Sequence, residues 1–315
     1  MLIGNYGVGN LGDEALRDYF LREFAEVQWQ VVSAEPQAGE LPRLPGGLRS
    51  LLRPWWKTIA GLWKADLVVL GGGSLFTDVE SLYACFLWWW HVALSRLLGQ
   101  PVHVAFQGYG PFRSTLGAWL GRSAIAMAEA VSVRDVESKT RIESQGMNKK
   151  VILSFDPVYK EILALNEEKM NTRIKNVYVI IPRRNPTKAF WAAVSNLQTD
   201  RYDAMHILSL QPDDVVEQRT CAAIAKVLPT AHIIRIRSLL ELVSACKDVS
   251  GILTQRYHGA LAGLALGLAV DIIPQRPNDK LAALSIENRS EWLTRIDAGE
   301  AVLREAFHDQ TSRLH

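Results

Sequence analysis

The sequence predicts an α/β protein with two lobes, each built on a parallel sheet with helices on both faces. Short runs of β-branched residues alternate with longer segments that carry apolar residues at three- and four-residue spacing. This alternation occurs in two series, separated by the polar run NEEKMNTRIKN at 166–176. The chain has 315 residues, which is enough for two domains of ordinary size.

The two series predict a domain at 1–165 and a second at 166–290. A C-terminal helix and tail follow at 291–315. Ligands of open α/β sheets bind beyond the carboxyl ends of the strands, so two such lobes predict a cleft between them. We therefore expect the functional residues in the loops that follow the strands.

The strands are predicted from short apolar runs, and the first of them, at 1–3, is unusually short. The apolar pair at 252–253 is too short to assign with the others. The segment 36–54 contains four prolines and three glycines and is expected to be irregular surface structure. The remaining predicted strands are 67–70, 102–106, 130–133, 151–153, 177–181, 204–210, 232–236 and 270–273.

Composition excludes several classes of protein. Hydrophobic residues make up 48% and charged residues 22%, which excludes a disordered or collagen-like chain. The net charge of +2 argues against nucleic-acid binding through a broadly basic surface. Three widely spaced cysteines predict neither a disulfide framework nor a zinc site and favour a reducing cytoplasm. No secretory leader is expected, and the apolar stretch 82–98 is too short for a membrane span.

A glycine-rich loop opens the chain. The segment 7–12, GVGNLG, matches the dinucleotide-binding pattern GxGxxG, in which backbone amides approach a diphosphate at a helix N-terminus. The adjacent carboxylates of Asp13 and Glu14 would repel a diphosphate there. Two interpretations remain open: the two acids match the helix dipole, or with Asn10 they bind the hydroxyls of a sugar acceptor.

Polar or glycine-rich loops follow three consecutive predicted strands. Gly71-Gly72-Gly73-Ser74 is either a ligand loop that allows close backbone approach or a tight turn with Ser74 as the helix cap. Gln107 follows the next strand. Arg134 follows the third and either clamps an anion or pairs with Asp135 or Glu137.

In the second half, Arg256 and His258 fall at the start of a helix made of small residues. A histidine beside an arginine at that position is either structural or an acid, base or anion ligand. Asp279-Lys280 follows the last predicted strand and brings another cation to the same end of the sheet.

These motifs, in this order, resemble those of the polysaccharide pyruvyl transferases. The resemblance covers about residues 1–285 and implies a GT-B-like fold of two Rossmann-type lobes. It also implies phosphoenolpyruvate as donor, no cofactor or metal, and formation of a pyruvate ketal on a cell-envelope sugar. The matching segments are GNYGVGNLGDEAL at 4–16, GGGSLFTD at 71–78, QGYGP at 107–111, SVRDVES at 132–138, DPV at 156–158 and QRYHGALAGLALG at 255–267.

The resemblance also implies roles for individual residues, and no metal ligand is among them. The other expected partner is a lipid-linked or polymeric glycan, and no nucleic acid is expected. The implied catalytic residues are Arg134, His258 and Lys280; the donor-binding residues are Arg256, Gly259, Gly72, Gly73 and Ser74; the acceptor-binding residues are Asn10, Asp13, Glu14 and Gln107.

Three other functions remain as alternatives. A glycosyltransferase that uses a nucleotide sugar shares the two-lobed architecture, and fold does not fix chemistry. A nicotinamide oxidoreductase would use the GxGxxG loop. A membrane-surface glycan-binding protein would keep the fold without the reaction.

Tryptophan is the compositional anomaly. Six of the ten tryptophans lie at 55–90, three of them consecutive. Consecutive helical residues point in different directions, so Trp88, Trp89 and Trp90 cannot all face one core. At least one of them faces solvent, a partner subunit or the membrane interface. Arg53 and the nearby lysines make contact of a cytoplasmic protein with the inner face of the cell membrane one of these alternatives.

Overall fold

The computed structural model describes residues 1–45, 52–167, 176–276, 280–286 and 288–313. The chain divides into two compact units. Unit 1 comprises Met1–Val8, Leu16–Pro157 and Ser290–His315, and unit 2 comprises Gly9–Ala15 and Val158–Arg289. The first turn of the first helix therefore belongs to unit 2, although the rest of that helix belongs to unit 1.

Unit 1 contains a seven-stranded sheet in the order β3-β2-β1-β4-β5-β6-β7, and every strand pair in it is parallel. The central strands are buried along their whole length, as expected of a sheet covered on both faces. The strands are β1 (Leu2–Ile3), β2 (Val31–Ser33), β3 (Leu41–Pro42), β4 (Val68–Gly71), β5 (Val102–Gln107), β6 (Ala130–Val133) and β7 (Val151–Leu153).

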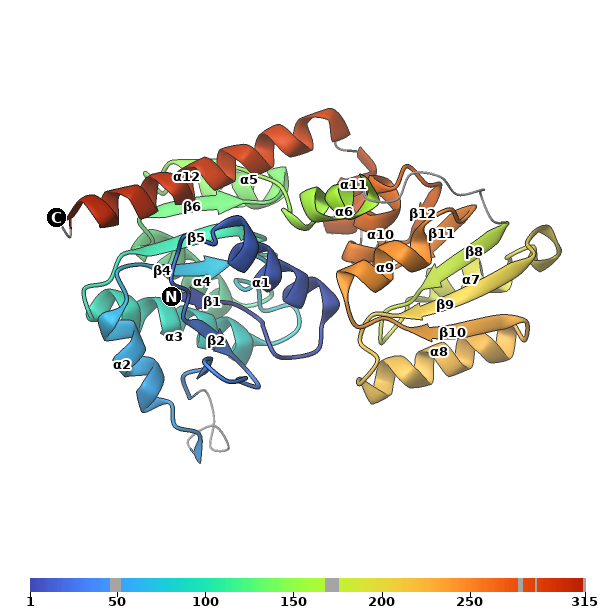
Figure 1. The fold of residues 1–315 in the computed structure, drawn as a ribbon, viewed down its shortest axis with the longest axis horizontal. Helices are drawn as coiled ribbons and strands as arrows, with labels where there is room; N and C mark the ends of the chain where they lie inside the picture. The colour runs from blue at the N-terminus through green and yellow to red at the C-terminus, as the bar shows by residue number, and fades with distance from the viewer. Residues whose placement is uncertain (46–51, 168–175, 277–279, 287, 314–315) are drawn as a thin grey trace. The chain divides into compact units, whose positions relative to one another are not determined.

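Helices cover both faces of this sheet (Figure 1). Because side chains alternate along a strand, Val68 and Leu70 of β4 join the core on one face, with Trp88 and Ala124 from the helices there. Tyr19 packs edge-to-face on Phe106 on the other face. The first face carries α2 (Trp56–Lys64), α3 (Leu82–Leu97), α4 (Thr115–Met127) and α5 (Val136–Ser144); the second carries α1 (Leu11–Glu23) and α12 (Trp292–Arg313).

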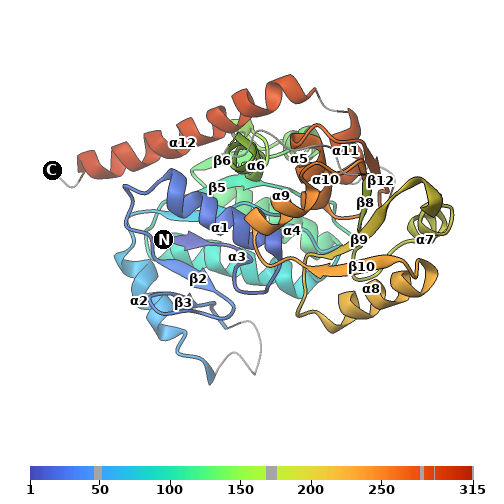
Figure 2. The same ribbon diagram turned by 45° about the vertical axis from the view of Figure 1, so that its right-hand side comes forward.

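Unit 2 contains a five-stranded parallel sheet in the order β10-β9-β8-β11-β12. α7 and α8 supply Phe190 and Ile224 to the core on one face, whereas α6, α9 and α10 pack together (Figure 2). Its strands are β8 (Val177–Ile181), β9 (Ala204–Ser209), β10 (Ala231–Arg235), β11 (Gly251–Thr254) and β12 (Val270–Ile272). Its helices are α6 (Val158–Glu167), α7 (Lys188–Ser195), α8 (Val215–Val227), α9 (Leu239–Cys246), α10 (Tyr257–Ala265) and α11 (Lys280–Ile286).

The predicted fold class is confirmed, since both sheets are parallel and helix-covered. The segment 36–54 is not wholly irregular, because Leu41 pairs with Val32 to form the edge strand β3. Asp271, which is unexpected inside an apolar run, lies on the edge strand β12. It accepts a hydrogen bond of 2.5 Å from the Tyr178 hydroxyl.

The three cysteines are buried and form no disulfide. Burial raises the pKa of Cys85 and Cys246 to about 12 and that of Cys221 to about 11. These thiols are therefore packing residues. Among the described helices, none is both long and hydrophobic enough to cross a bilayer, and the apolar helix α3 has 16 residues.

Candidate functional site

Four neighbouring strands of unit 1 end in loops that contact one another. Gly72 and Gly73 follow β4 with φ of +73° and +84°, a conformation that favours glycine. The Gly72 amide donates to Ala105 (2.8 Å) and the Gly108 amide donates to the Gly73 carbonyl (2.7 Å). The glycine loop is thus held against the end of β5 in one defined shape.

Gln107 lies beneath this loop and is fully buried. Its Nε2 donates to the carbonyls of Leu70 (3.3 Å) and Gly72 (2.5 Å), and its Oε1 accepts from the Leu75 amide (3.2 Å). Just before it, Phe106 adopts φ of +54°, where the register between β5 and β6 shifts. Gln107 therefore braces the glycine loop, and these contacts favour a positioning role over direct contact with an acceptor.

Arg134, at the end of β6, is 1% exposed. Its Nη1 donates to Asp156 (2.9 Å) and its Nη2 donates to Ser74 Oγ (2.7 Å). The alternative partners expected from the sequence are engaged elsewhere: Asp135 caps α5, and Glu137 pairs with Arg141. The Arg134–Asp156 ion pair thus fastens the glycine loop to the ends of β6 and β7.

Asp78, which closes the motif GGGSLFTD, stabilises the start of α4. It accepts from the amides of Arg113 (2.5 Å) and Ser114 (2.8 Å) and from the Ser114 hydroxyl (2.6 Å). Burial raises the pKa of Asp78, but these hydrogen bonds outweigh burial and leave the pKa below its ordinary value. The motif therefore includes a structural carboxylate as well as a loop.

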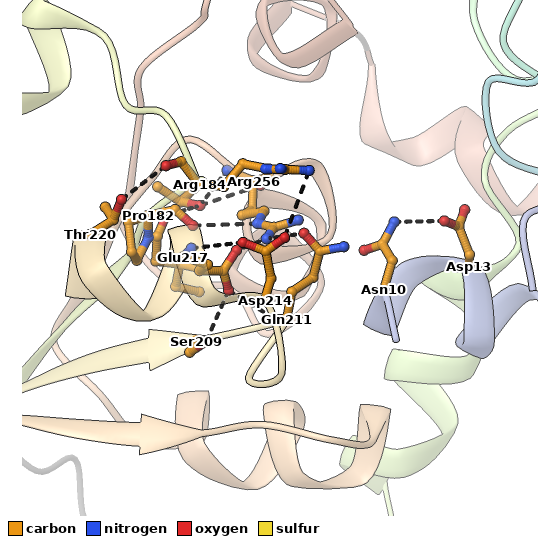
Figure 3. A network of polar contacts seen from close by, with 12 residues as sticks. Asn10, Asp13, Pro182, Arg184, Ser209, Gln211, Asp214, Glu217, Thr220 and Arg256 are labelled. Atoms are coloured by element: carbon orange, nitrogen blue, oxygen red, sulfur yellow. Dashed lines mark hydrogen bonds and ion pairs between the residues drawn. The ribbon is translucent and has the colours of Figure 1, made fainter. Parts of the chain in front are cut away.

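In unit 2, the arginine before α10 is the centre of a polar network (Figure 3). Arg256 Nη2 donates to Gln211 Oε1 (2.8 Å) and forms an ion pair with Glu217, and its Nε donates to the Pro182 carbonyl (3.3 Å). The Glu217 carboxylate is completely buried. It also accepts from the Ser209 hydroxyl (3.0 Å) and the Gln211 amide (2.7 Å). The ends of β8, β9 and β11 are thereby linked.

His258 lies in the first turn of α10 and is half-buried. A Cβ added at Gly12 would overlap its imidazole ring, so the ring rests directly on the backbone of the first turn of α1. In the same turn, Asn10 Nδ2 donates to Asp13 Oδ2 (2.6 Å) (Figure 3). The last glycine of GVGNLG therefore makes room for the imidazole ring of His258.

The structure brings several predicted residues together within unit 2. Asn10, Asp13, Arg256 and His258 lie at the adjoining N-terminal ends of α1 and α10. Gly259 is buried with its Cα beside the Thr254 hydroxyl, where a side chain would not fit.

The remaining predicted residues lie elsewhere. Glu14 borders a small pocket with Gly9, Pro212 and Arg237. Lys280 is the first residue of α11, but its side chain, like the whole of Asp279, falls outside the described part of the chain.

Sequence reasoning missed three residues of these networks: Asp156, Gln211 and Glu217. Asp156 belongs to the DPV segment, and Gln211 follows a predicted strand, so their positions carried a signal. Glu217 lies three residues after the N-cap Asp214, a spacing typical of helix starts. That spacing predicts a cap, but it does not predict that the carboxylate holds Arg256.

The unit 2 site suits an anion. The N-terminus of a helix carries positive partial charge and unpaired amides, and α10 presents it beside Arg256 and His258. Arg183 and Arg184 follow β8 at the same edge of the sheet. In the described part of the chain, no group of three or more His, Cys, Asp or Glu side chains is placed to hold a metal ion.

Gly12→Ala is expected to displace the His258 ring and lower the free energy of unfolding by about 1–3 kcal/mol, the usual cost of overpacking. Urea unfolding of unit 2, followed by fluorescence of a label on that unit, measures the change. In the His258→Ala background the same substitution should cost much less, because the ring that it strikes is gone.

Gly9→Ala is the matched control, because Gly9 has φ of +67° and nothing lies near its missing side chain. Its cost should come from backbone strain alone and should be the same with or without His258. If Gly12→Ala lowered the free energy of unfolding equally with and without His258, close packing of the His258 ring on Gly12 would be contradicted.

Comparisons with known proteins agree with this architecture. The sequence model described as polysaccharide pyruvyl transferase matches residues 10–270. No curated protein is similar enough in sequence to be matched.

Solved structures match over nearly the whole chain, at low identity. UDP-GlcNAc 2-epimerase from Neisseria meningitidis, bound to UDP-GlcNAc, gives a TM-score of 0.57 at 14% identity over 98% of this chain and 99% of that chain. Anabaena Alr3699/HepE, in complex with UDP and glucose, gives 0.55 at 12% identity over 99% and 97%. The matches confirm a GT-B-like fold.

Proposed function

Because the chain belongs to the polysaccharide pyruvyl transferase family, and is therefore an enzyme, we propose that it transfers pyruvate from phosphoenolpyruvate to two hydroxyls of one sugar. The sugar is part of a cell-envelope or extracellular polysaccharide or of its lipid-linked precursor. The product is a cyclic ketal, and inorganic phosphate is released. The reaction needs no cofactor.

The observation that carries this proposal is the placement of Arg256 and His258 at the N-terminus of α10, where the His258 ring lies against the first turn of α1. Phosphoenolpyruvate bears a phosphate and a carboxylate. Arginine and a helix N-terminus are suited to both groups. Beside them, the half-buried His258 supplies an imidazole, a side chain that enzymes use as general acid and base.

The proposed reaction begins with proton transfer from His258 to the methylene carbon of the donor, which becomes a methyl group. The former enol carbon becomes an oxocarbenium-like centre, and the first sugar hydroxyl adds to it. The carbon–oxygen bond to phosphate then breaks, and the second hydroxyl adds. Of the two hydroxyl protons, one restores the protonated histidine and the other leaves with phosphate.

The remaining residues have supporting roles in this proposal. Asp13, oriented by Asn10, accepts the proton of one acceptor hydroxyl and passes it to the departing phosphate, and Glu14 binds the same sugar. Arg256 and Lys280 neutralise the departing phosphate, which lowers the barrier to its release. Gly72, Gly73 and Ser74 form a binding loop whose shape Arg134 and Gln107 maintain, so we propose Arg134 as a positioning residue.

Phosphate release from phosphoenolpyruvate, measured with a panel of lipid-linked N-acetylhexosamines and galactosides, tests the proposal. At least one acceptor should stimulate release, and the modified sugar should carry a pyruvate ketal. Failure with every acceptor, together with no stabilisation of the protein by phosphoenolpyruvate against heat, would contradict it.

A nucleotide-sugar glycosyltransferase is the second candidate, because structures of similar fold have been solved with UDP and UDP sugars. The same thermal measurement separates the two functions. Stabilisation by UDP sugars without stabilisation by phosphoenolpyruvate would favour the glycosyltransferase.

A further inference from the structure

The outer surface of α2, α3 and α4 in unit 1 exposes large apolar side chains. Trp56 is 58% exposed, Trp63 67% and Trp119 55%. Three tryptophans that are each more than half exposed are unusual for a free protein surface. We define the aromatic face as Trp56, Trp63, Tyr83, Phe86, Leu116 and Trp119, all of which are exposed.

These residues share one side of the unit because their helices cover the same face of the sheet. Trp56 and Trp63 are seven residues apart on α2 and so point the same way. Trp89, on the same stripe of α3 as Phe86, contacts Trp119 of α4 with ring centroids 5.7 Å apart. α3 and α4 lie side by side (Figure 2). The consecutive tryptophans are thus divided: Trp88 is buried against the sheet, and Trp89 is partly exposed.

The three helices that carry the aromatic face are basic. The sequences of α2, α3 and α4 contain no aspartate or glutamate, whereas Lys57, Lys64 and Arg122 are exposed on them. Trp119 and Arg122 border one shallow hollow. α12, on the opposite face of the same sheet, carries four acidic residues: Asp297, Glu300, Glu305 and Asp309. α5, on the same face of the sheet as these helices, carries Glu137 and Glu143, and α12 also carries Arg295 and Arg304, so the lack of acidic residues is particular to α2, α3 and α4.

We infer that the aromatic face docks on the surface of an anionic phospholipid bilayer. Tryptophan and tyrosine favour the headgroup region, where an apolar ring and a polar edge are both accommodated. Lysine and arginine beside them are attracted to anionic lipids, at about 1 kcal/mol each near the surface. The face therefore combines the two contributions that hold peripheral proteins on membranes.

A second copy of the chain is a poorer occupant. A two-fold interface places the same patch on both partners, so it would bring the basic residues Lys57, Lys64 and Arg122 of both copies together. The three helices offer no carboxylate to pair with them. Anionic lipid provides the missing negative charge.

Flotation with vesicles tests the inference without relying on the transfer reaction. The full chain should float with vesicles of equal parts phosphatidylglycerol and phosphatidylcholine and should stay behind with pure phosphatidylcholine. Lys57→Gln/Lys64→Gln/Arg122→Gln should lower the partition coefficient about 100-fold, at about fivefold per charge. Trp56→Ser/Trp63→Ser should lower it at least about tenfold.

Two control variants replace the same number of charged or apolar side chains elsewhere. Lys188→Gln/Arg219→Gln/Lys226→Gln removes three exposed charges from unit 2, and Val227→Ser/Leu240→Ser removes two exposed apolar side chains. Both should float like the unmodified chain. All four variants should keep the melting temperature of the unmodified chain, which separates loss of docking from loss of fold.

Three results would overturn the inference: no flotation of the unmodified chain, equal losses in the face and control variants, or self-association without lipid that Trp56→Ser/Trp63→Ser abolishes. The last result would identify a second copy of the chain as the occupant. Sedimentation velocity of the unmodified chain and of this variant measures it.

Discussion

Replacing His258 by alanine is expected to lower the rate of phosphate release from phosphoenolpyruvate about 10²–10⁴-fold, the usual effect of removing a general acid or base. The ring is half-buried at the N-terminus of α10 and rests on Gly12, so its position is set by the fold. The loss should appear in kcat, because the proposed donor-binding groups, Arg256 and the N-terminus of α10, are unchanged in this variant.

His232→Ala is the control for this substitution, since it removes an exposed histidine from β10 of the same unit. Its turnover should match that of the unmodified enzyme. His258→Gln keeps a polar side chain, but its amide cannot act as a general acid. This variant should therefore be as inactive as His258→Ala. Near-normal turnover of His258→Ala would show that another group protonates the donor.

Replacing Asp156 by alanine is expected to lower the free energy of unfolding of unit 1 by about 3–5 kcal/mol, because it leaves the Arg134 guanidinium buried without its carboxylate. Both side chains are almost inaccessible to water. Nine of the ten tryptophans belong to unit 1, so tryptophan fluorescence during urea unfolding reports this unit.

The matched control is Asp213→Ala, which breaks an exposed ion pair with Arg237. That change should cost less than about 1 kcal/mol, as expected of surface pairs. Arg134→Met/Asp156→Leu should recover most of the stability lost in Asp156→Ala, since it removes both charges. If Asp156→Ala cost no more than Asp213→Ala, the ion pair would not hold unit 1 together.

The double variant also separates stability from function. Without Arg134, Ser74 loses the guanidinium that donates to its hydroxyl, and the glycine loop loses one of its supports. We therefore expect Arg134→Met/Asp156→Leu to be folded but to have a raised KM for its substrates. An unchanged KM would contradict the positioning role.

The strands and their order of appearance could be predicted from local signals. Runs such as Val177–Ile181 are buried on both faces and read as continuous β-branched stretches. β3 was not predicted because its two residues, Leu41 and Pro42, are too few to give a strand pattern. The strand forms through pairing with β2, which is a tertiary contact.

The site could be predicted as a set of strand-end residues, but their partners could not. Arg134 was placed correctly at the end of a strand, yet its carboxylate comes from Asp156, beyond the next strand, and the nearer acids are used elsewhere. Likewise, the match to GxGxxG does not reveal that Gly12 lies under an imidazole from the far end of the chain. Such contacts depend on the packing of distant elements, which local propensity does not encode.

The tryptophans that cluster in the sequence are divided between the core and the surface of unit 1. Trp88 fills the core under β4, whereas Trp56 and Trp63 remain exposed beside lysines. Helical periodicity indicated that the three consecutive tryptophans would be divided between core and surface. The absence of acidic residues from all of α2, α3 and α4 became meaningful only once these helices were found on one face of the sheet.

The most direct test of the proposed reaction is the mass of the sugar product formed from phosphoenolpyruvate in heavy water. An acid whose proton exchanges with the solvent should place one deuterium in the methyl group of the ketal. Phosphate should be released in an amount equal to that of the ketal. His258→Ala should form this product at least about 100-fold more slowly. A product that retains the methylene group, or a sugar modified without consumption of phosphoenolpyruvate, would contradict the proposal.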